Sequence, residues 1–168
     1  SLDDTVAIAR EAARRQLVVH MHVEEQRREI DEAIAAYGKR PMAVLTEALP
    51  IDERFTAVHC THTDAGDMAR FLAAGGRVCV CPLTEANLGD GTPNLDHARR
   101  VGGRLSIGTD SNARISMLEE MRWLEYGQRL RTESRGILTA DGHSARAVLD
   151  AATIGGARAL GVEAGQIS

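Results

Sequence analysis

The sequence predicts an α/β fold in which parallel strands alternate with helices. Apolar runs of strand length alternate with amphipathic helical patterns along the 168 residues. Strands that are joined by helical crossovers pair in parallel. The residues that are able to do chemistry gather where the predicted strands end. Four such β/α units are half of an eight-stranded barrel.

Four short apolar runs provide the strands. The expected strands cover residues 17–23, 55–60, 77–81 and 104–110. Pro82 ends the third of them because proline cannot donate a hydrogen bond to a sheet. A sheet of four parallel strands follows from this order.

Helical patterns fill the first half of the chain between these strands. Ser1 is a suitable N-cap for a helix over residues 2–15, whose apolar side chains lie on one side. A second helix has apolar residues at i, i+3, i+4 and i+7 from Ile30 and stops at Gly38. A short third helix is expected after Pro41.

The second half of the chain repeats the alternation. Asp64 and Ser144 are suitable N-cap residues, and Ser116 with Glu119 forms a capping box at the start of a long helix. The expected helices cover residues 64–74, 95–101, 116–131 and 144–160, and polar loops are expected at residues 84–91 and 134–142.

The composition excludes several classes of protein. With 43% hydrophobic and 26% charged residues, the chain is not expected to be disordered, and no apolar stretch approaches the roughly 20 residues that cross a bilayer. A net charge of −4 and only 3% aromatic residues argue against nucleic-acid binding. The polar start carries no signal-peptide pattern, and three cysteines, an odd number, indicate free thiols. We therefore expect a cytoplasmic protein without nucleic-acid or membrane partners.

Reactive side chains follow three of the four predicted strands. In a parallel β/α array such residues meet at the carboxyl end of the sheet. His22 ends the first strand and is followed by Glu25, His59 ends the second strand, and Asp110 ends the fourth. Imidazole and carboxylate donors suit a cation such as zinc. A histidine that is not a ligand, or a glutamate, can move a proton.

Each of these residues, taken singly, also has a structural explanation. A histidine in a strand usually packs in the core, and an aspartate at a strand end often caps the next helix. Cys79 and Cys81 are expected to be small buried thiols, and Glu85 and Asn87 can order ligands or cap a turn. His62 fits a site or a loop equally well. The three reactive strand ends together favour a functional site.

Several motifs resemble the metal-dependent amidohydrolase superfamily, and within it the formiminoglutamate deiminase family. The resemblance covers nearly the whole chain. The motifs around His22, His59 and Asp110 are similar to superfamily signals, whereas residues 84–91 and the helix around Trp123 resemble the deiminase branch. The matching segments are HVEEQ (22–26), AVHCTH (57–62), CPLTEANLGDG (81–91), GTDS (108–111), EEMRWLEYGQRL (119–130) and AATIGGARALG (151–161).

The resemblance implies a partial (β/α)8 barrel, also called a TIM barrel. Its strands five to eight would correspond to the four strands here, so residues 1–168 would form the C-terminal half of a metal-dependent hydrolase barrel. The N-terminal half barrel and a small β-sandwich would lie outside this chain. Because a half barrel leaves two sheet edges unpaired, we expect a homo-oligomer, a dimer in the simplest case.

The resemblance also implies roles for individual residues. His22 and Asp110 would bind one divalent metal, zinc or alternatively iron. Asp110 would also act as a base, and His59 and Glu25 would handle the remaining proton transfers. The implied small-molecule reaction converts N-formimino-L-glutamate and water to N-formyl-L-glutamate and ammonia. Because a zinc site needs about four donors, this chain alone is expected to bind metal weakly and to be inactive.

Three alternatives stay open at this point. His20 and His22 could instead be the metal-binding pair of barrel strand one. The number of strands before Asp110 and the position of Glu25 favour strand five for this segment. In that placement His20 is a residue of the core or of a second layer around the site. A nucleobase or cyclic amidine could be the substrate, since Asp3 stands where the deiminase family has an arginine. The chain could also be a catalytically silent half barrel. No substrate-binding residue is assigned.

Overall fold

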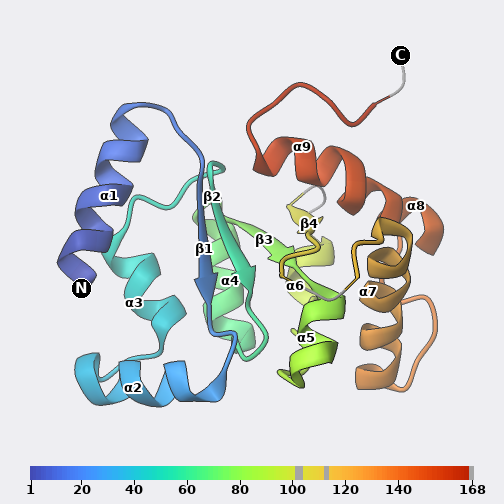
Figure 1. Cartoon of the computed structure of the whole chain (residues 1–168), viewed down its shortest axis with the longest axis horizontal. Helices are drawn as coiled ribbons and strands as arrows, with labels where there is room; N and C mark the ends of the chain where they lie inside the picture. Colours follow the sequence, from blue (N-terminus) through green and yellow to red (C-terminus); the bar gives the residue numbers. More distant parts are fainter. Residues whose placement is uncertain (101–103, 112–113, 167–168) are drawn as a thin grey trace.

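A four-stranded parallel sheet forms the centre of the structure, a computed structural model that describes residues 1–100, 104–111 and 114–166 (Figure 1). The strands lie in chain order, β1-β2-β3-β4, so each strand pairs with the next one in the sequence. Their bounds are β1 (Val19–Val23), β2 (Phe55–His59), β3 (Arg77–Val80) and β4 (Leu105–Ile107). The predicted α/β class and the parallel pairing are confirmed.

Helices form every connection between these strands. Before β2 the chain forms α1 (Leu2–Arg14), α2 (Arg27–Tyr37) and α3 (Pro41–Ala48). Between β2 and β4 it forms α4 (Ala65–Ala73), α5 (Pro82–Leu88) and α6 (Asp96–Arg100). After β4 it forms α7 (Met117–Thr132), α8 (Ser144–Asp150) and α9 (Gly156–Ala159).

The helix caps follow the prediction in three places. Ser1, Asp64 and Ser116 each accept a hydrogen bond from a backbone N–H in the first turn of α1, α4 and α7. Ser144 is the first residue of α8, and His143 holds the N-cap position instead. The expected end of the sixth helix at Val101 lies outside the described residues.

The secondary structure predicted for two segments is wrong. Residues 84–91 do not form a continuous loop, because α5 begins at Pro82 and reaches Leu88. Proline is well suited to the first position of a helix, and Gly89 ends α5 in the left-handed conformation (φ 75°). The last predicted helix is interrupted by a π-helical turn, η1 (Ala151–Gly155), between α8 and α9.

The two faces of the sheet differ. Val19, Met21 and Val23 on β1 point to the helices and join the hydrophobic core, whereas His20 and His22 are exposed on the other face. The alternation arises because neighbouring side chains of a strand point to opposite faces. The core contains buried apolar side chains from the strands and from the helices, among them Met42, Met68, Phe71, Leu72, Val78, Val80, Leu95 and Leu124.

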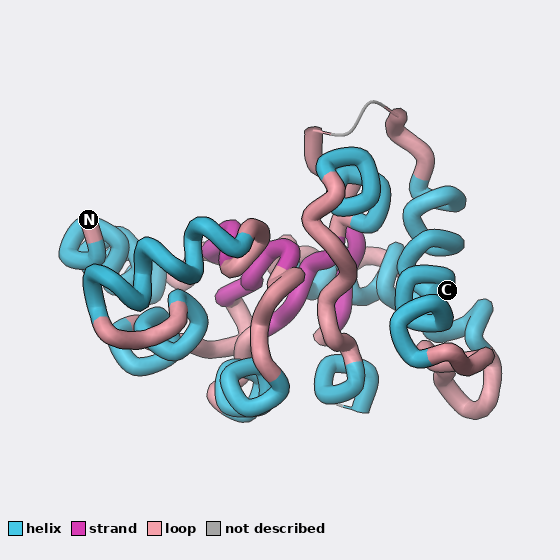
Figure 2. The backbone as a smooth tube through the Cα atoms, turned by 90° about the horizontal axis from the view of Figure 1, so that it is seen from below, coloured by secondary structure: helices cyan, strands magenta, loops and turns pink. Residues whose placement is uncertain are grey.

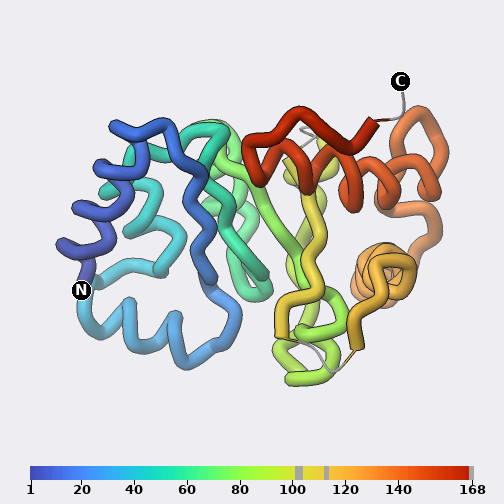
Figure 3. The backbone as a smooth tube through the Cα atoms, turned by 45° about the horizontal axis from the view of Figure 1, so that its top comes forward, coloured from blue at the N-terminus to red at the C-terminus, as the bar shows by residue number. Residues whose placement is uncertain are grey.

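The strands point to one common end of the molecule, where the reactive residues lie. Figure 1 shows the arrowheads of β1 and β2 at the same end, and Figure 2 views the molecule from that side. At the opposite end, η1 and α9 lie against β4 (Figure 3). A Cβ on Gly155 would come within 2.1 Å of the Leu105 carbonyl oxygen, so this close contact requires glycine.

None of the helices in the described part of the chain has the length and apolar character that a membrane crossing requires.

Candidate active site

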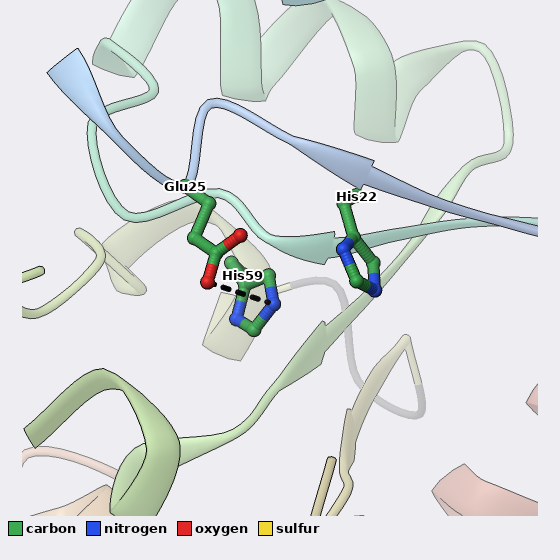
Figure 4. Close-up of side chains that lie close together, drawn as sticks. All are labelled: His22, Glu25 and His59. Atoms are coloured by element: carbon green, nitrogen blue, oxygen red, sulfur yellow. Dashed lines mark ion pairs between the residues drawn. The ribbon is translucent and has the colours of Figure 1, made fainter. Parts of the chain in front are cut away.

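His59 is the centre of a cluster at the carboxyl end of the sheet. Its imidazole is fully buried, and its Nε2 lies 3.7 Å from Oε1 of Glu25 and 3.8 Å from Oδ2 of Asp110. The ring of His22 meets the ring of His59 edge to face, with 5.0 Å between the centroids. Figure 4 shows His22, Glu25 and His59 in this arrangement. The structure therefore brings together all four residues that the sequence analysis selected.

Tight turns at the strand ends present these side chains. Glu24, His59, Cys60 and Asp110 have positive φ angles of 52°, 70°, 54° and 46°. Non-glycine residues rarely adopt this left-handed region, and such residues cluster at functional sites. The turn after β1 and the end of β2 are joined by backbone hydrogen bonds, from Cys60 N–H to Val23 O (3.0 Å) and from His62 N–H to Glu24 O (3.1 Å).

Glu85, in α5, orients the His59 ring. Its Oε1 lies 3.2 Å from Nδ1 of His59 and also accepts the backbone N–H of Cys81 at 2.9 Å. Both side chains are buried, and a carboxylate partner places the ring proton on Nδ1. The opposite nitrogen, Nε2, is buried and has no hydrogen-bond partner among the described residues. It is therefore available to a metal or to a substrate.

The charges around His59 decide its protonation. Burial alone lowers the pKa of His59, but the hydrogen bond to Glu85 and the charges of Glu25, Glu85 and Asp110 outweigh it, so the pKa is raised. Burial raises the pKa of Glu85 as well, despite its hydrogen bond to His59. Both groups therefore bind protons more tightly than usual, which favours a proton shared in the Nδ1–Glu85 contact.

The donors in the cluster fit a divalent metal such as zinc. Two sets of potential ligand atoms lie within 4.8 Å of one another: His22, Glu25 and His59 form one set, and His59, Cys81 and Asp110 form the other. Imidazole, carboxylate and thiolate are the ligand types that zinc prefers. Both sets contain His59, whose buried Nε2 has no hydrogen-bond partner among the residues that the structure describes, so these donors fit a metal.

Buried polar contacts hold the turn that carries Glu25. Glu29 accepts the backbone N–H groups of Glu24 (2.9 Å) and Glu25 (3.1 Å). The buried carboxylate of Glu24 accepts the backbone N–H of Met42 at 3.1 Å and lies 3.4 Å from Nη2 of Arg40, which also donates to the carbonyl of His62. These contacts fix the end of β1 against the end of β2.

The remaining sequence candidates lie outside the cluster. His20 is exposed, and its Nε2 lies 2.9 Å from the carbonyl oxygen of Ala159. The prediction of a core position for His20 is therefore wrong in this chain, and a place in a second layer around the site stays a prediction. Asp3 is exposed in the first turn of α1. His62 is half-buried, and burial together with the charge of Arg27 lowers its pKa.

Sequence reasoning missed two features of the cluster. From the sequence, Cys81 is assigned only the role of a small buried thiol. Cys81 nevertheless ends the third predicted strand, and residues at the carboxyl ends of parallel strands are candidates for the site. A hydrogen bond to Cys79 and burial raise the pKa of the Cys81 thiol, so it stays protonated without a metal. Glu85 is named from the sequence as a residue that can order ligands, but its pairing with His59, 26 positions away, is not predicted there.

The comparisons with known proteins agree with this geometry. The sequence profile of the amidohydrolase family matches residues 1–168. A formimidoylglutamate deiminase from Pseudomonas aeruginosa is 43% identical over 97% of this chain, and a 5-methylthioadenosine/S-adenosylhomocysteine deaminase from Halobacterium salinarum is 31% identical over 99%. The chain spans 36% and 37% of the lengths of these two curated relatives.

Two solved structures share the fold. An amidohydrolase from Brucella melitensis superposes with a TM-score of 0.84 and is 39% identical over 89% of this chain and 34% of its own. A zinc-bound adenosine deaminase from Xanthomonas campestris superposes with a TM-score of 0.90 and is 28% identical over all of this chain and 38% of its own. The family profile, the relatives and the cluster at the strand ends lead to one conclusion: the chain belongs to the amidohydrolase family.

Proposed function

We propose that this chain supplies part of the active site of a metal-dependent deiminase that acts on a formimidoyl compound. The reaction adds water to the carbon–nitrogen double bond of N-formimidoyl-L-glutamate (the N-formimino-L-glutamate named above) and releases ammonia, leaving N-formyl-L-glutamate. The observation that carries the proposal is Nε2 of buried His59, which lies within 4 Å of the carboxylates of Glu25 and Asp110 and has no hydrogen-bond partner among the described residues. The similarity to the deiminase from Pseudomonas aeruginosa supports the choice of substrate.

His22 and Asp110 are proposed to hold the metal, which is zinc in our proposal, with iron as an alternative. A zinc ion bound there would activate water as a nucleophile and polarise the carbon–nitrogen double bond. The zinc in the related adenosine deaminase structure supports this choice of ion. Because one imidazole and one carboxylate are fewer than a zinc site requires, the rest of the ligands would come from other parts of the barrel.

The side chains around the substrate would then divide the proton transfers. Asp110 accepts the proton of the attacking water. His59, whose Nδ1–H is engaged with Glu85 and whose raised pKa favours the imidazolium, would donate from Nε2–H to the developing tetrahedral centre and stabilise its negative charge. Two protons must reach the departing nitrogen. Glu25, 3.7 Å from Nε2 of His59, would pass one from its protonated carboxyl group, and Asp110 would return the proton that it took from water. The hydroxyl group on the carbon would then give its proton to Glu25 as ammonia leaves as a neutral molecule.

The proposed architecture follows from the same resemblance. We assign β1 to β4 to strands five to eight of a (β/α)8 barrel, and residues 1–168 to the C-terminal half of that barrel. Exposed apolar side chains on α7, including Leu118 and Leu130, support a homodimer. The three free cysteines fit a reducing compartment, which supports a cytoplasmic location.

A second candidate function is deamination of an adenine ring. The relative from Halobacterium salinarum and the zinc-bound structure from Xanthomonas campestris both carry names of adenosine-type deaminases, which supports this alternative. Both reactions replace a C–N bond by a C–O bond and release ammonia, so the same four side chains serve either one. The substrate pocket decides between them.

A substrate panel tests the proposal. The complete gene product is loaded with zinc, and ammonia release is measured with N-formimidoyl-L-glutamate and, in parallel, with 5′-methylthioadenosine and adenosine. Release from the first compound alone supports the deiminase. Release from the nucleosides alone replaces it with the second candidate, and no release from any of them contradicts both.

A further inference from the structure

Cys79 and Cys81 place two thiols side by side at the carboxyl end of β3. Val78 and Val80 of this strand are buried in the core, whereas Cys79 lies on the opposite face and is half-buried. The thiol of Cys81 donates a hydrogen bond to the sulfur of Cys79, and neither residue forms a disulfide. The pair is therefore a cluster of nucleophilic groups that the proposed reaction does not use.

The backbone after β4 shows where the two sulfur atoms lie. An ideal Cβ at Gly108 would be 3.3 Å from Sγ of Cys81 and 3.4 Å from Sγ of Cys79. Both sulfur atoms therefore converge on this one glycine instead of pointing apart along β3. Because glycine carries no Cβ, the two thiols can approach this backbone closely.

The spacing of the pair suits a shared metal ion better than a disulfide. Alternate Cβ atoms of an extended strand point in the same direction about 6.6 Å apart, whereas a disulfide needs about 3.5–4.5 Å between them. Two thiolates on one tetrahedral ion are roughly 3.8 Å apart, since a zinc–sulfur bond is about 2.3 Å long. Hydrogen-bonded sulfur atoms are already close to this separation, so one cation can bridge Cys79 and Cys81 while β3 stays intact.

The thiol pair adjoins the reaction centre. Sγ of Cys81, a ring nitrogen of His59 and a carboxylate oxygen of Asp110 lie within 4.8 Å of one another. Cys79 adds a second sulfur to this set, which then offers the four donors that a tetrahedral ion takes. Thiolate sulfur selects soft cations, whereas the imidazole and carboxylate of His22 and Asp110 suit a harder ion. The two groups of donors therefore differ in the cation that they prefer.

We propose that Cys79 and Cys81 form an inhibitory site for a soft, thiophilic cation of the Cd²⁺ or Cu⁺ class, with His59 as a further ligand. Each thiol releases its proton to solvent as its metal–sulfur bond forms, and the cation replaces the proton on Nε2 of His59. This use of His59 rests on the proposed function, in which Nε2–H faces the substrate. The soft cation and the substrate then exclude each other at His59.

Cadmium binding tests the site in the zinc-loaded complete gene product. Cd²⁺ is titrated in, and the ultraviolet charge-transfer band of cadmium–thiolate bonds is followed together with the ¹¹³Cd NMR resonance, whose position reports the number of sulfur ligands. The wild type is expected to bind one equivalent through two sulfur atoms. In C79A and C81A the affinity should fall by more than the about 10- to 100-fold loss caused by removing a residue that only hydrogen-bonds to a metal ligand.

Cys60 provides the matched control. It is a third free cysteine, but it is fully buried and packs in the hydrophobic core. C60A should therefore keep the band and the affinity of the wild type. C79S and C81S repeat the test with a polar side chain, and circular dichroism identifies the folded variants to be compared. No band in the wild type, an unchanged affinity in folded variants of Cys79 or Cys81, or an equal loss in C60A overturns the proposal.

Inhibition of turnover tests whether the cation occupies His59. Ammonia release from N-formimidoyl-L-glutamate is measured at increasing Cd²⁺, and each protein is compared with its own rate before Cd²⁺ is added. The wild type and C60A should be inhibited as the band saturates, whereas C79A should need at least about tenfold more Cd²⁺.

Two results reject the role of His59. Cadmium bound to the thiols without inhibition shows that the ring stays available, and equal inhibition of wild type and C79A places the effect at the zinc site. Elemental analysis of zinc in the inhibited proteins checks the second case. The binding titration needs no turnover, so it decides on the thiol site even if no substrate of the proposed function is hydrolysed.

Discussion

The Nδ1 atom of His59 lies 3.2 Å from Oε1 of Glu85, and both side chains are buried. This contact fixes which ring nitrogen faces the reaction centre, because the proton on Nδ1 is held by the carboxylate. Glu85 is thus a positioning residue: it touches His59, and His59 touches the cluster.

Replacing Glu85 tests this relationship. E85Q keeps the acceptor for Cys81 N–H but weakens the hold on the His59 proton, so kcat/KM is expected to fall by about 10- to 100-fold, the usual cost of losing such a partner. Nitrogen NMR of His59 should show a mixture of tautomers in the variant. E125Q is the control, since Glu125 is a buried carboxylate that binds the backbone of Leu138 instead. A single unchanged tautomer in E85Q would contradict the assigned role.

Metal content tests the ligand assignment. In the complete gene product, the H22A and D110A variants are expected to lose zinc. Their activity should fall by more than the about 10- to 100-fold loss caused by removing a residue that only hydrogen-bonds to a metal ligand. H20A is the matched control, because His20 lies on the same face of β1 but bonds to the carbonyl of Ala159. Elemental analysis of the purified proteins gives the answer. Full zinc content in both H22A and D110A would rule out these ligands.

Adjacent glycines test the packing at the other end of the sheet. G155A places a methyl group 2.1 Å from the Leu105 carbonyl, so it is expected to lower stability by about 1–3 kcal/mol. G156A meets nothing within 4 Å and is expected to raise stability by about 0.5–1 kcal/mol, because alanine loses less entropy than glycine in a helix. Thermal unfolding of the two variants should give shifts of opposite sign.

The burial of Glu120 predicts that the free energy of unfolding depends on pH. It is fully buried, its Oε2 accepts the N–H of Leu83 at 2.9 Å, and burial raises its pKa. A carboxyl group with a higher pKa in the folded state binds its proton more tightly there, so its ionisation destabilises the fold as pH rises through that folded pKa. E120Q keeps the acceptor and removes the charge.

Urea unfolding of wild type and E120Q checks this prediction at about pH 4.5 and about pH 7.5. Relative to the wild type, the variant should gain stability at the higher pH. If the difference between the two proteins is the same at both pH values, the buried charge of Glu120 has no such effect.

The sequence predicted the scaffold well because its signals are local. Strand-length runs and helix caps such as Ser1 and Asp64 depend on residues a few positions apart, and the structure contains them. The rule that reactive residues meet at the carboxyl ends of parallel strands also predicts that Glu25, His59 and Asp110 lie together, as the structure shows. In contrast, α5 was missed because its polar residues hid the helix signals of Pro82 and Gly89.

The supporting contacts could not be predicted because they join distant residues. Glu24 and Met42 are 18 positions apart, and Arg40 and His62 are 22 apart. No periodicity relates such pairs, since they meet only when α3 and the end of β2 pack against β1. The active-site residues are therefore readable in the sequence, whereas the residues that hold them in place require the fold.

The left-handed turns at His59 and Asp110 have an evolutionary consequence. Each of these positions must satisfy a reactive role and an unfavourable backbone angle at once, so few replacements can survive there. Changes in substrate preference should instead accumulate at neighbouring positions that combine no reactive role with a left-handed backbone. Laboratory libraries that aim for new substrates would best leave these two turns untouched.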